Sequence, residues 1–374
     1  MLSMLVTLAL IVWLVALLLP WQPWRCRERL DADAAGAPDV SDVTVLIPAR
    51  NEAEAIGTTL RTLAATDAGL PVVLVDDESD DATVAVAQAC GLRHLQVVAG
   101  STPPPGWTGK LWAMQQGLAQ VTTPYVLLLD ADIRLAPGLL PALRCKAEQG
   151  FALVSLCACP NGQGWAARWL LPAFVYFFKW LYPFALANRA DSRVAAAAGG
   201  VVLIERQALL DVGGFAAWRD AIIDDCTLAA HVKRGGHRCW IGLTHDAVSQ
   251  RRSGLADIVR MVARTAFVQL RESWWRLLAA SLLLVLVFWL PLVGVACGTA
   301  RIRAIGALAW LLLAISHVPV LRYYRRCLWL APCLPLAAGV FLWATWLSAW
   351  RSLGGTRSVW KGRRYAGAAS QTRE

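Results

Sequence analysis

The first 24 residues of the chain carry no charged side chain, and this run constrains how the rest of the molecule can be placed. A helix rises about 1.5 Å per residue, so a helix over residues 1–24 is long enough to span a bilayer. A secretory signal would need a basic start and a shorter apolar core, and neither is present. Arg25, Arg27 and Arg29 follow directly, and basic residues stay on the cytoplasmic side. We therefore expect a transmembrane helix at 1–24 and then a cytoplasmic segment that starts with a polar linker at 25–42.

The end of the chain is also apolar, with runs at Leu277–Ala300, Ala304–Leu321 and Cys327–Trp350. The first and last are long enough to cross a membrane, and the middle one is marginal. They predict a membrane region of two to three helices at 275–350, in a chain that is 57% hydrophobic and only 17% charged. If all three runs crossed, the basic tail at 351–374 would lie outside, although its Lys and Arg content favours the inside. One re-entrant run would remove this conflict, and the sequence does not indicate which run it is.

The net charge of +10 raises the question of nucleic acid, but the basic residues lie beside the apolar runs. They cluster at 25–29, 322–326 and 357–364, which fits anionic lipid and topology control better. We therefore predict no nucleic-acid partner. The ten cysteines show no spacing typical of a zinc site, which favours small buried side chains in a reducing compartment.

Between the apolar ends, short strand-like runs alternate with helical spacing, the pattern of a doubly wound α/β domain. Mostly β-branched runs that end in polar residues predict buried parallel strands, with ligands at their carboxyl ends. We place this domain at 43–264. The predicted strands are Val43–Pro48, Val72–Val75 and Val126–Leu129, and the predicted helices are Glu52–Ala65 and Asp81–Cys90.

Within this domain, Trp165–Ala187 is apolar and aromatic but is interrupted by Arg168 and Lys179. These charges favour an interfacial helix that lies in the membrane surface. A helix that crosses the membrane is the alternative.

The strongest chemical signal is Asp130-Ala131-Asp132, directly after the predicted strand that ends at Leu129. On an extended chain, side chains two residues apart point the same way, so the two carboxylates would face one ligand. Such a pair can hold Mg²⁺ or Mn²⁺, and the cation clamps a diphosphate. A triplet of this kind also occurs by chance in solvated turns, so its meaning depends on the other polar residues of the domain.

Polar residues also follow the other two predicted strands. Asp76 and Asp77 close the second strand, where a carboxylate can accept hydrogen bonds from a nucleobase edge and a ribose hydroxyl. The first strand ends in Pro48-Ala49-Arg50-Asn51-Glu52, in which Pro48 ends the hydrogen-bonded ladder and Arg50 can reach a phosphate. Three strand ends therefore carry groups suited to a nucleotide.

Two later positions supply charges suited to catalysis. Lys110 closes the segment Gly106-Trp107-Thr108-Gly109-Lys110 on a proline-rich loop, and it offers a point charge for a diphosphate. An ordinary surface lysine is the alternative. Asp224-Asp225 precedes a predicted helix at Cys226–Lys233, and one of these acids can take the proton of an attacking hydroxyl. A like-charged neighbour raises the pKa of such a base, although two acids that cap the helix are the alternative.

Two further pairs are candidates for contacts with the acceptor or with phosphate. Gly199 and Gly200 precede a predicted strand at Val201–Ile204 and would let an acceptor approach, with tight packing as the alternative. Arg260 and Arg264 share one face of a helix because they are four residues apart. They contact either the leaving diphosphate or lipid phosphate, and the sequence leaves both open.

Together and in this order, these motifs resemble the family 2 glycosyltransferases with the GT-A fold, over Val43 to Arg264. The resemblance implies that Asp130 and Asp132 are metal and diphosphate ligands and that Asp225 is the base. A nucleoside site would then be lined by the first two strand ends, with Pro48, Arg50, Glu52, Asp76 and Asp77. The pair here is Asp-Asp where Glu-Asp is commoner, so the division of roles between Asp224 and Asp225 stays open.

More closely, the chain resembles the hopene-associated glycosyltransferases of bacteria. The shared segments are G-W-T-G-K, I-D-D, R-M-V-A-R-T-A-F and the terminal V-W-K-G-R, and the Q-x-x-R-W motif of processive members is absent. The resemblance implies an inverting transfer of one sugar from a nucleotide-sugar, a UDP-sugar, to a lipid hydroxyl such as that of a hopanoid. It also implies a multi-pass protein of the bacterial inner membrane with a cytoplasmic catalytic domain. Transfer to polyprenyl phosphate and a non-catalytic membrane scaffold are the alternatives.

Overall fold

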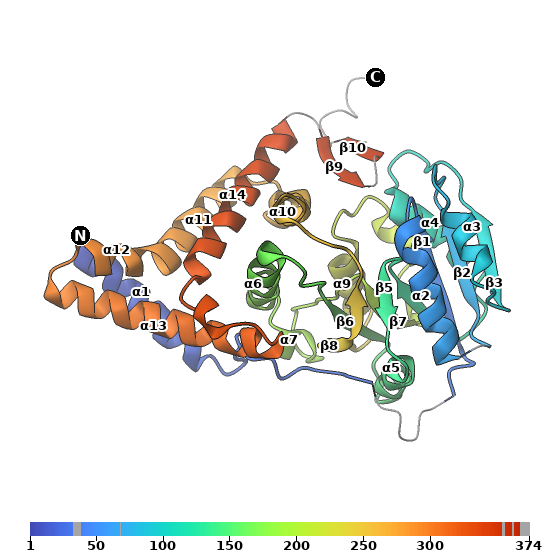
Figure 1. Cartoon of the computed structure of the whole chain (residues 1–374), viewed down its shortest axis with the longest axis horizontal. Helices are drawn as coiled ribbons and strands as arrows, with labels where there is room; N and C mark the ends of the chain where they lie inside the picture. The colour runs from blue at the N-terminus through green and yellow to red at the C-terminus, as the bar shows by residue number, and fades with distance from the viewer. Residues whose placement is uncertain (33–38, 68, 354–355, 361–362, 367–374) are drawn as a thin grey trace.

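The computed structural model contains an eight-stranded sheet with helices around it and a second group of helices to one side (Figure 1). It describes residues 1–374 apart from 33–38, 68, 354–355, 361–362 and 367–374, with side chains up to residue 353. The strand order is β3-β2-β1-β4-β7-β6-β8-β5. The strands are β1 Val43–Ala49, β2 Val72–Asp76, β3 Leu95–Ala99, β4 Tyr125–Leu129, β5 Ile133–Leu135, β6 Leu153–Cys159, β7 Val201–Glu205 and β8 Cys239–Ser249.

The helices of the sheet domain are α2 Ala53–Thr66, α3 Thr83–Ala89, α4 Gly109–Leu118, α5 Leu139–Glu148, α8 Arg206–Asp211, the 3₁₀ helix η1 Gly214–Trp218 and α9 Asp224–Arg234. Those between this domain and the second group are α6 Trp165–Leu181, α7 Phe184–Ala187 and α10 Leu255–Gln269. The second group is α1 Leu2–Leu18, α11 Trp274–Leu284, the π-helix η2 Val285–Trp289, α12 Leu290–Cys297, α13 Ala300–Tyr323, the 3₁₀ helix η3 Leu328–Leu330 and α14 Leu334–Leu353. A two-stranded hairpin, β9 Thr356–Trp360 and β10 Arg363–Ala366, falls in the predicted basic tail, and the rest of that tail lies outside the described residues.

The first half of the sheet is parallel, as the sequence predicted. β1 pairs with β2 and β4, and β2 pairs with β3, all in the parallel sense. The three predicted strands and the first two predicted helices are each found within two residues of their expected ends. Every residue of β1 is buried, because helices cover both faces of this part of the sheet. The carboxyl ends of β1, β2 and β4 therefore meet at one edge, which carries the predicted acids.

The second half of the sheet is mixed, which corrects the expectation of parallel strands for the predicted strand at Val201–Ile204. β7 runs antiparallel to both β4 and β6, and β5 runs antiparallel to β8. The chain leaves β6 at the carboxyl edge and enters β7 at the same edge, where Leu129 of β4 pairs with Val201. A strand entered from that edge must run back through the sheet. This return places Gly199 and Gly200 beside the end of β4.

The segment predicted as a polar linker, 25–42, is in part bound to the sheet. The N–H of Leu30 donates to the carbonyl of Leu243 in β8 at 3.0 Å, and the N–H of Leu243 donates to the carbonyl of Glu28 at 2.9 Å. The residues at 33–38 lie outside the description. The beginning of this segment therefore acts as a short extra strand, because β8 has backbone groups left unpaired at this point.

Among the residues that the structure describes, two helices are long and apolar enough to cross a membrane, judged by length and composition: the continuous helix Trp274–Cys297 and α13. They correspond to the first two of the three predicted runs. α1 has 17 residues and is shorter than the predicted 1–24. The third run forms α14, which is not one of these two.

A tryptophan joins α1 to the first of these helices. Pro291 has no N–H to donate to the carbonyl of Val287, four residues earlier, and the helix is widened to a π-helix at this point. The indole N–H of Trp13 donates to that carbonyl at 2.9 Å. An apolar environment makes an unpaired carbonyl costly, so this contact fixes α1 against η2.

Contacts at its two ends show how α14 lies. Its start is beside the middle of α13, because the Trp310 indole donates to the carbonyl of Pro332 at 2.9 Å. Its end is beside α10, because the hydroxyl of Ser348 accepts from the N–H of Phe267 at 3.1 Å. α13 itself ends at the sheet domain, where the carbonyl of Tyr323 lies 2.8 Å from Nε2 of His245. The chain thus returns to the side of the sheet domain after α13 and also ends α14 there (Figure 1).

The predicted interfacial helix at 165–187 forms α6 and α7, and Lys179 within it is not exposed to solvent. The side chain of Lys179 is only 1% exposed, and its ammonium lies 3.0 Å from the carboxylate of Glu28. This buried ion pair joins α6 to the segment that follows α1. Whether α6 lies in a membrane surface stays a prediction.

We expect the substitution Glu28→Gln to destabilise the protein by about 3 kcal/mol, because it leaves the Lys179 ammonium buried without its counter-charge. The double variant Glu28→Gln/Lys179→Met should recover most of this loss, since a buried apolar side chain needs no partner. Thermal unfolding of the detergent-solubilised protein measures both. Equal stability of the wild type and Glu28→Gln would show that the pair contributes little.

Candidate active site

A chain of opposite charges lies at the carboxyl edge of the sheet. The ammonium of Lys110 is 2.9 Å from a carboxylate oxygen of Asp130 and 3.2 Å from one of Asp224. With Gly199 and Asp225, Lys110 and Asp224 line a small cavity of about 20 Å³. The structure therefore brings together five of the predicted site positions, from α4, the end of β4, the turn before β7 and the start of α9.

Lys110 lies in the first turn of α4, which corrects its predicted place in a loop. The residues after it, Leu111 to Leu118, favour a helix, and Thr108 adopts the extended conformation that begins one. A lysine is unfavourable at a helix N-terminus, because the macrodipole is positive there. Burial alone would lower the pKa of Lys110, but the carboxylates of Asp130 and Asp224 outweigh it and hold that pKa above its usual value. Lys110 is therefore a fixed positive charge.

Asp225 lies at the start of α9, as predicted, and two backbone donors fix its carboxylate. One oxygen accepts from the N–H of Gly199 at 2.8 Å, and the other accepts from the N–H of Cys226 at 2.7 Å. Burial and the neighbouring charge of Asp224 raise the pKa of Asp225 to about 6. A Cβ at position 199 would lie 3.4 Å from both Asp225 Oδ2 and Lys110 Nζ, which is an ordinary van der Waals distance. Asp225 is therefore held in one orientation and titrates in a range useful to a general base.

The Asp130-Ala131-Asp132 segment forms a turn between β4 and β5, which corrects the extended geometry inferred from the sequence. The N–H of Ile133 donates to the carbonyl of Asp130 at 3.1 Å, closing the turn. Asp130 faces Lys110, whereas the buried Asp132 accepts a hydrogen bond from the Ser249 hydroxyl at 2.7 Å. The two acids follow one strand but have different partners.

Arg251 is a site residue that the sequence did not single out from its basic neighbours. Its guanidinium lies 3.2 Å from the carboxylate of Asp132 and 2.7 Å from that of Glu52. It follows directly on β8, and only the mixed sheet brings the end of β8 beside β5 and the turn after β4. The nearest signal in the sequence is the basic pair Arg251-Arg252 itself.

The first two strand ends carry their predicted residues at the same edge. Asp77 is fully buried, and the guanidinium of Arg50 donates to its carbonyl and lies 3.9 Å from its carboxylate. Asp76 is the last residue of β2, and one of its oxygens accepts from the N–H of Ser79 at 3.4 Å. Pro48 does not end the strand, because β1 continues to Ala49. Arg50 thus orients Asp77 in this structure, and its contact with a phosphate stays a prediction.

Arg260 and Arg264 lie exposed on α10. Arg260 pairs with Asp257 on its own helix at 2.5 Å, and among the described residues no ion pair joins either arginine to the carboxylates of the site. Within the same residues, no group of three or more His, Cys, Asp or Glu side chains could hold a metal by itself. A cation bound here would therefore need further ligands from a substrate or from water.

The sequence agrees with this geometry when it is compared with known proteins. A family model described as "Glycosyltransferase like family 2" matches residues 38–267, more than half of the chain. The chain belongs to this family. An uncharacterised glycosyltransferase of Mycobacterium bovis is 32% identical to it over 174 residues, which cover 46% of this chain and 71% of the relative. A 4,4'-diaponeurosporenoate glycosyltransferase of Staphylococcus aureus is 33% identical over 91 residues, or 24% of each chain.

Among solved structures, the family 2 glycosyltransferase is similar to a mannosyltransferase of Pyrobaculum calidifontis determined with GDP-Man and Mn²⁺. The TM-score is 0.56 at 20% identity, with 91% of this chain and 98% of the other covered. This similarity concerns the fold. The predicted GT-A-like α/β fold and the predicted enzyme class, a glycosyltransferase, are confirmed, whereas the finer resemblance to the hopene-associated enzymes stays a prediction.

Transfer that depends on the ionised Asp225 carboxylate should lose activity as the pH falls through about 6, where Asp225 takes up a proton. Lys110 lowers the pKa of Asp225, so Lys110→Gln should move the midpoint of this acid limb to higher pH. Profiles of kcat/KM against pH for the two proteins measure the shift. If the acid limb has the same midpoint in both proteins, the group that titrates there is not Asp225.

Proposed function

We propose that this glycosyltransferase moves one sugar, with inversion, from a nucleotide-sugar to a hydroxyl of a membrane lipid. The observation that carries the proposal is the fixed carboxylate of Asp225 beside the Lys110–Asp130 ion pair. Asp225 supplies a base and Lys110 supplies a positive charge, as inverting transfer to a hydroxyl requires. The sequence resemblance supports a UDP-sugar as donor and a hopanoid as acceptor within this class.

In the proposed step, the acceptor oxygen attacks the anomeric carbon while Asp225 takes the hydroxyl proton. The new carbon–oxygen bond forms as the bond from the anomeric carbon to the diphosphate oxygen breaks. The electron pair of that bond leaves on the nucleoside diphosphate, where Lys110 offsets the added negative charge. Asp224 keeps Lys110 in place through its 3.2 Å ion pair and raises the pKa of Asp225 by its own charge.

Asp130 and Asp132 fit a divalent cation in the chemistry of their donors, since Mg²⁺ and Mn²⁺ prefer carboxylate oxygens. In this structure both acids face positive side chains, Lys110 at 2.9 Å and Arg251 at 3.2 Å, and a bound cation would replace these contacts. The mannosyltransferase of similar fold was determined with Mn²⁺. When bound, the ion would neutralise the leaving diphosphate. Arg50, Glu52, Asp76 and Asp77 would line the nucleoside side of the same edge.

The apolar helices support a place at a membrane, with the sheet domain in the cytoplasm of a bacterium. The two helices Trp274–Cys297 and α13 form a hairpin that is long and apolar enough to enter a bilayer. After this hairpin, the end of α13 lies beside the sheet domain. α14 ends beside α10 on that side, so we infer that it is the run that does not cross. The chain would then end in the cytoplasm, which agrees with its basic tail.

A reporter fused to the C-terminus tests this topology. We expect a fluorescent protein that folds only in the cytoplasm to be bright there, and alkaline phosphatase, which needs the periplasm, to be inactive. The opposite pattern would mean that α14 crosses the membrane.

Transfer of labelled sugar into total membrane lipid, from a panel of nucleotide-sugars, tests the proposed reaction. We expect label in a lipid band that EDTA abolishes and added Mn²⁺ restores. Asp225→Asn should lose transfer by about a hundredfold or more, because it removes the base, while donor binding stays. Asp211→Asn, which changes an exposed acid on α8, is the matched control and should keep full activity.

Asp225→Asn and the labelled lipid also distinguish the proposed reaction from its two alternatives. Transfer to polyprenyl phosphate needs no base for a hydroxyl, so label would then appear in a phosphate-linked lipid and Asp225→Asn would keep activity. A non-catalytic scaffold would label nothing from any donor and would not bind one. Either result would overturn the proposed reaction.

A further inference from the structure

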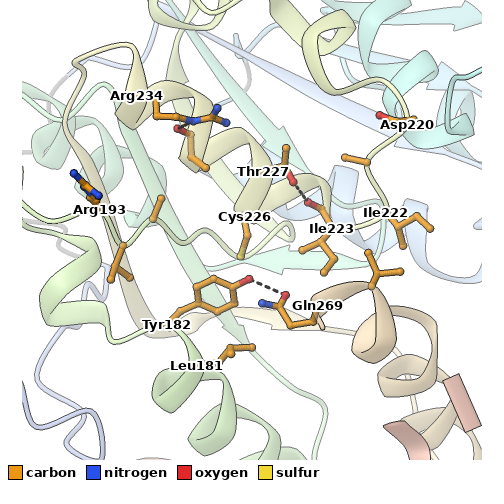
Figure 2. Close-up of a pocket in the computed structure, with 15 residues that line it drawn as sticks. Leu181, Tyr182, Arg193, Asp220, Ile222, Ile223, Cys226, Thr227, Arg234 and Gln269 are labelled. Carbon is orange, nitrogen blue, oxygen red and sulfur yellow. Dashed lines mark hydrogen bonds between the residues drawn. The ribbon is translucent and has the colours of Figure 1, made fainter. Parts of the chain in front are cut away.

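A second, larger cavity of about 640 Å³ lies between the sheet domain and the helices beside it (Figure 2). One wall comes from α9 and the residues before it, and another from the loop at 193–195. The far wall comes from the ends of α6 and α10, where the hydroxyl of Tyr182 donates to the Gln269 amide oxygen at 2.8 Å. The lining side chains include Leu181, Tyr182, Arg193, Ile222, Ile223, Cys226, Thr227, Arg234, Val268 and Gln269.

This cavity lies directly beside the base of the proposed reaction. Cys226 lines it, and the N–H of Cys226 holds one oxygen of Asp225 at 2.7 Å. The other oxygen of Asp225 is held by Gly199, which belongs to the small cavity with Lys110. Asp225 itself lines the small cavity with Lys110, and its neighbours Ile223 and Cys226 line the large one.

The walls of the cavity also connect it to the apolar helices. α10 contacts α14 through Phe267 and Ser348, and α6 contacts α13 through the 2.7 Å hydrogen bond between Tyr176 and Ser316. The ends of α6 and α10, joined by the Tyr182–Gln269 hydrogen bond, therefore connect the wall of the cavity to the apolar helices. Leu181, Ile222, Ile223 and Val268 give this part of the lining an apolar character.

The charges of the lining lie apart from its apolar part. Arg193 and Arg234 lie on one side of the cavity, and Asp220 lies on the opposite side (Figure 2). Among the residues described, neither arginine forms an ion pair, and Arg234 donates only to the carbonyl of Ala230 on its own helix, at 3.0 Å. Two guanidinium groups on one side of a cavity that also has an apolar part suit a phosphate or carboxylate group on an apolar stem.

We propose that this cavity is the acceptor site and that it selects a lipid with an anionic group close to its reacting hydroxyl. The inference rests on the proposed function and narrows its lipid: the hydroxyl is directed to the Cys226 side, where Asp225 is held, the anion contacts Arg193 and Arg234, and the apolar stem lies against Leu181 and Val268. A neutral alcohol such as a simple hopanoid would form no ion pair with either arginine.

Two lipids that differ in the phosphate alone test the inference by binding, without a sugar donor. Lauroyl-glycerol and lauroyl-glycerol 3-phosphate carry the same chain, the same glycerol and a free hydroxyl, and each is radiolabelled and bound to immobilised full-length protein in nonionic detergent. We expect the phosphate lipid to bind about tenfold more tightly, or about 1.4 kcal/mol. The double variant Arg193→Gln/Arg234→Gln should reduce this preference to about twofold or less. Arg61→Gln, an exposed arginine on α2, should keep it.

Val268→Trp locates the bound lipid. An indole on the α10 wall should weaken binding of both lipids if they occupy the cavity, and unchanged binding would place them elsewhere and overturn the inference. Equal binding of the two lipids to the wild type, or a preference that survives the double arginine variant, would also overturn it. If the preference stands but the Asp225→Asn test fails, the proposed reaction is wrong and the cavity remains a site for anionic lipid.

Discussion

The ion pairs of Lys110 with Asp130 and Asp224 are the interaction on which the rest of the site depends. Acids from the end of β4 and the start of α9 would repel one another if they met without a cation between them. Lys110 joins them at 2.9 and 3.2 Å, although its place in the first turn of α4 opposes the helix dipole. That local conflict is typical of a functional position, where a favourable helix start is given up for a charge in the right place.

The mixed sheet fixes the orientation of the charged side chains in this site. Because β7 returns from the carboxyl edge, the N–H of Gly199 reaches one oxygen of Asp225 and leaves that carboxylate beside Lys110. The antiparallel pairing of β5 with β8 brings Arg251 to Asp132 and Glu52. The antiparallel strands therefore gather a donor edge and a base into one site.

The sequence predicted the parts of this site that depend on local pattern. The strand exits at Asp76, Asp77 and Asp130 and the helix start at Asp225 follow from short apolar runs and their polar ends. It did not predict the helix that begins at Gly109, because the prolines and glycines before Lys110 read as a loop. Nor could it predict Arg251, whose partners lie 119 and 199 residues away and meet it only through antiparallel pairing. The cavity beside Cys226 is likewise formed by α6, α9 and α10, which no local pattern connects.

The contact between Trp13 and Val287 has a consequence for how the protein is made. The two residues are 274 positions apart, and the whole sheet domain lies between them in the chain. During synthesis α1 emerges first, and the sheet domain can fold as a unit before η2 exists. Trp13 therefore cannot make this hydrogen bond until Val287 has been synthesised, in the last quarter of the chain. Docking of α1 on η2 thus follows synthesis of the sheet domain.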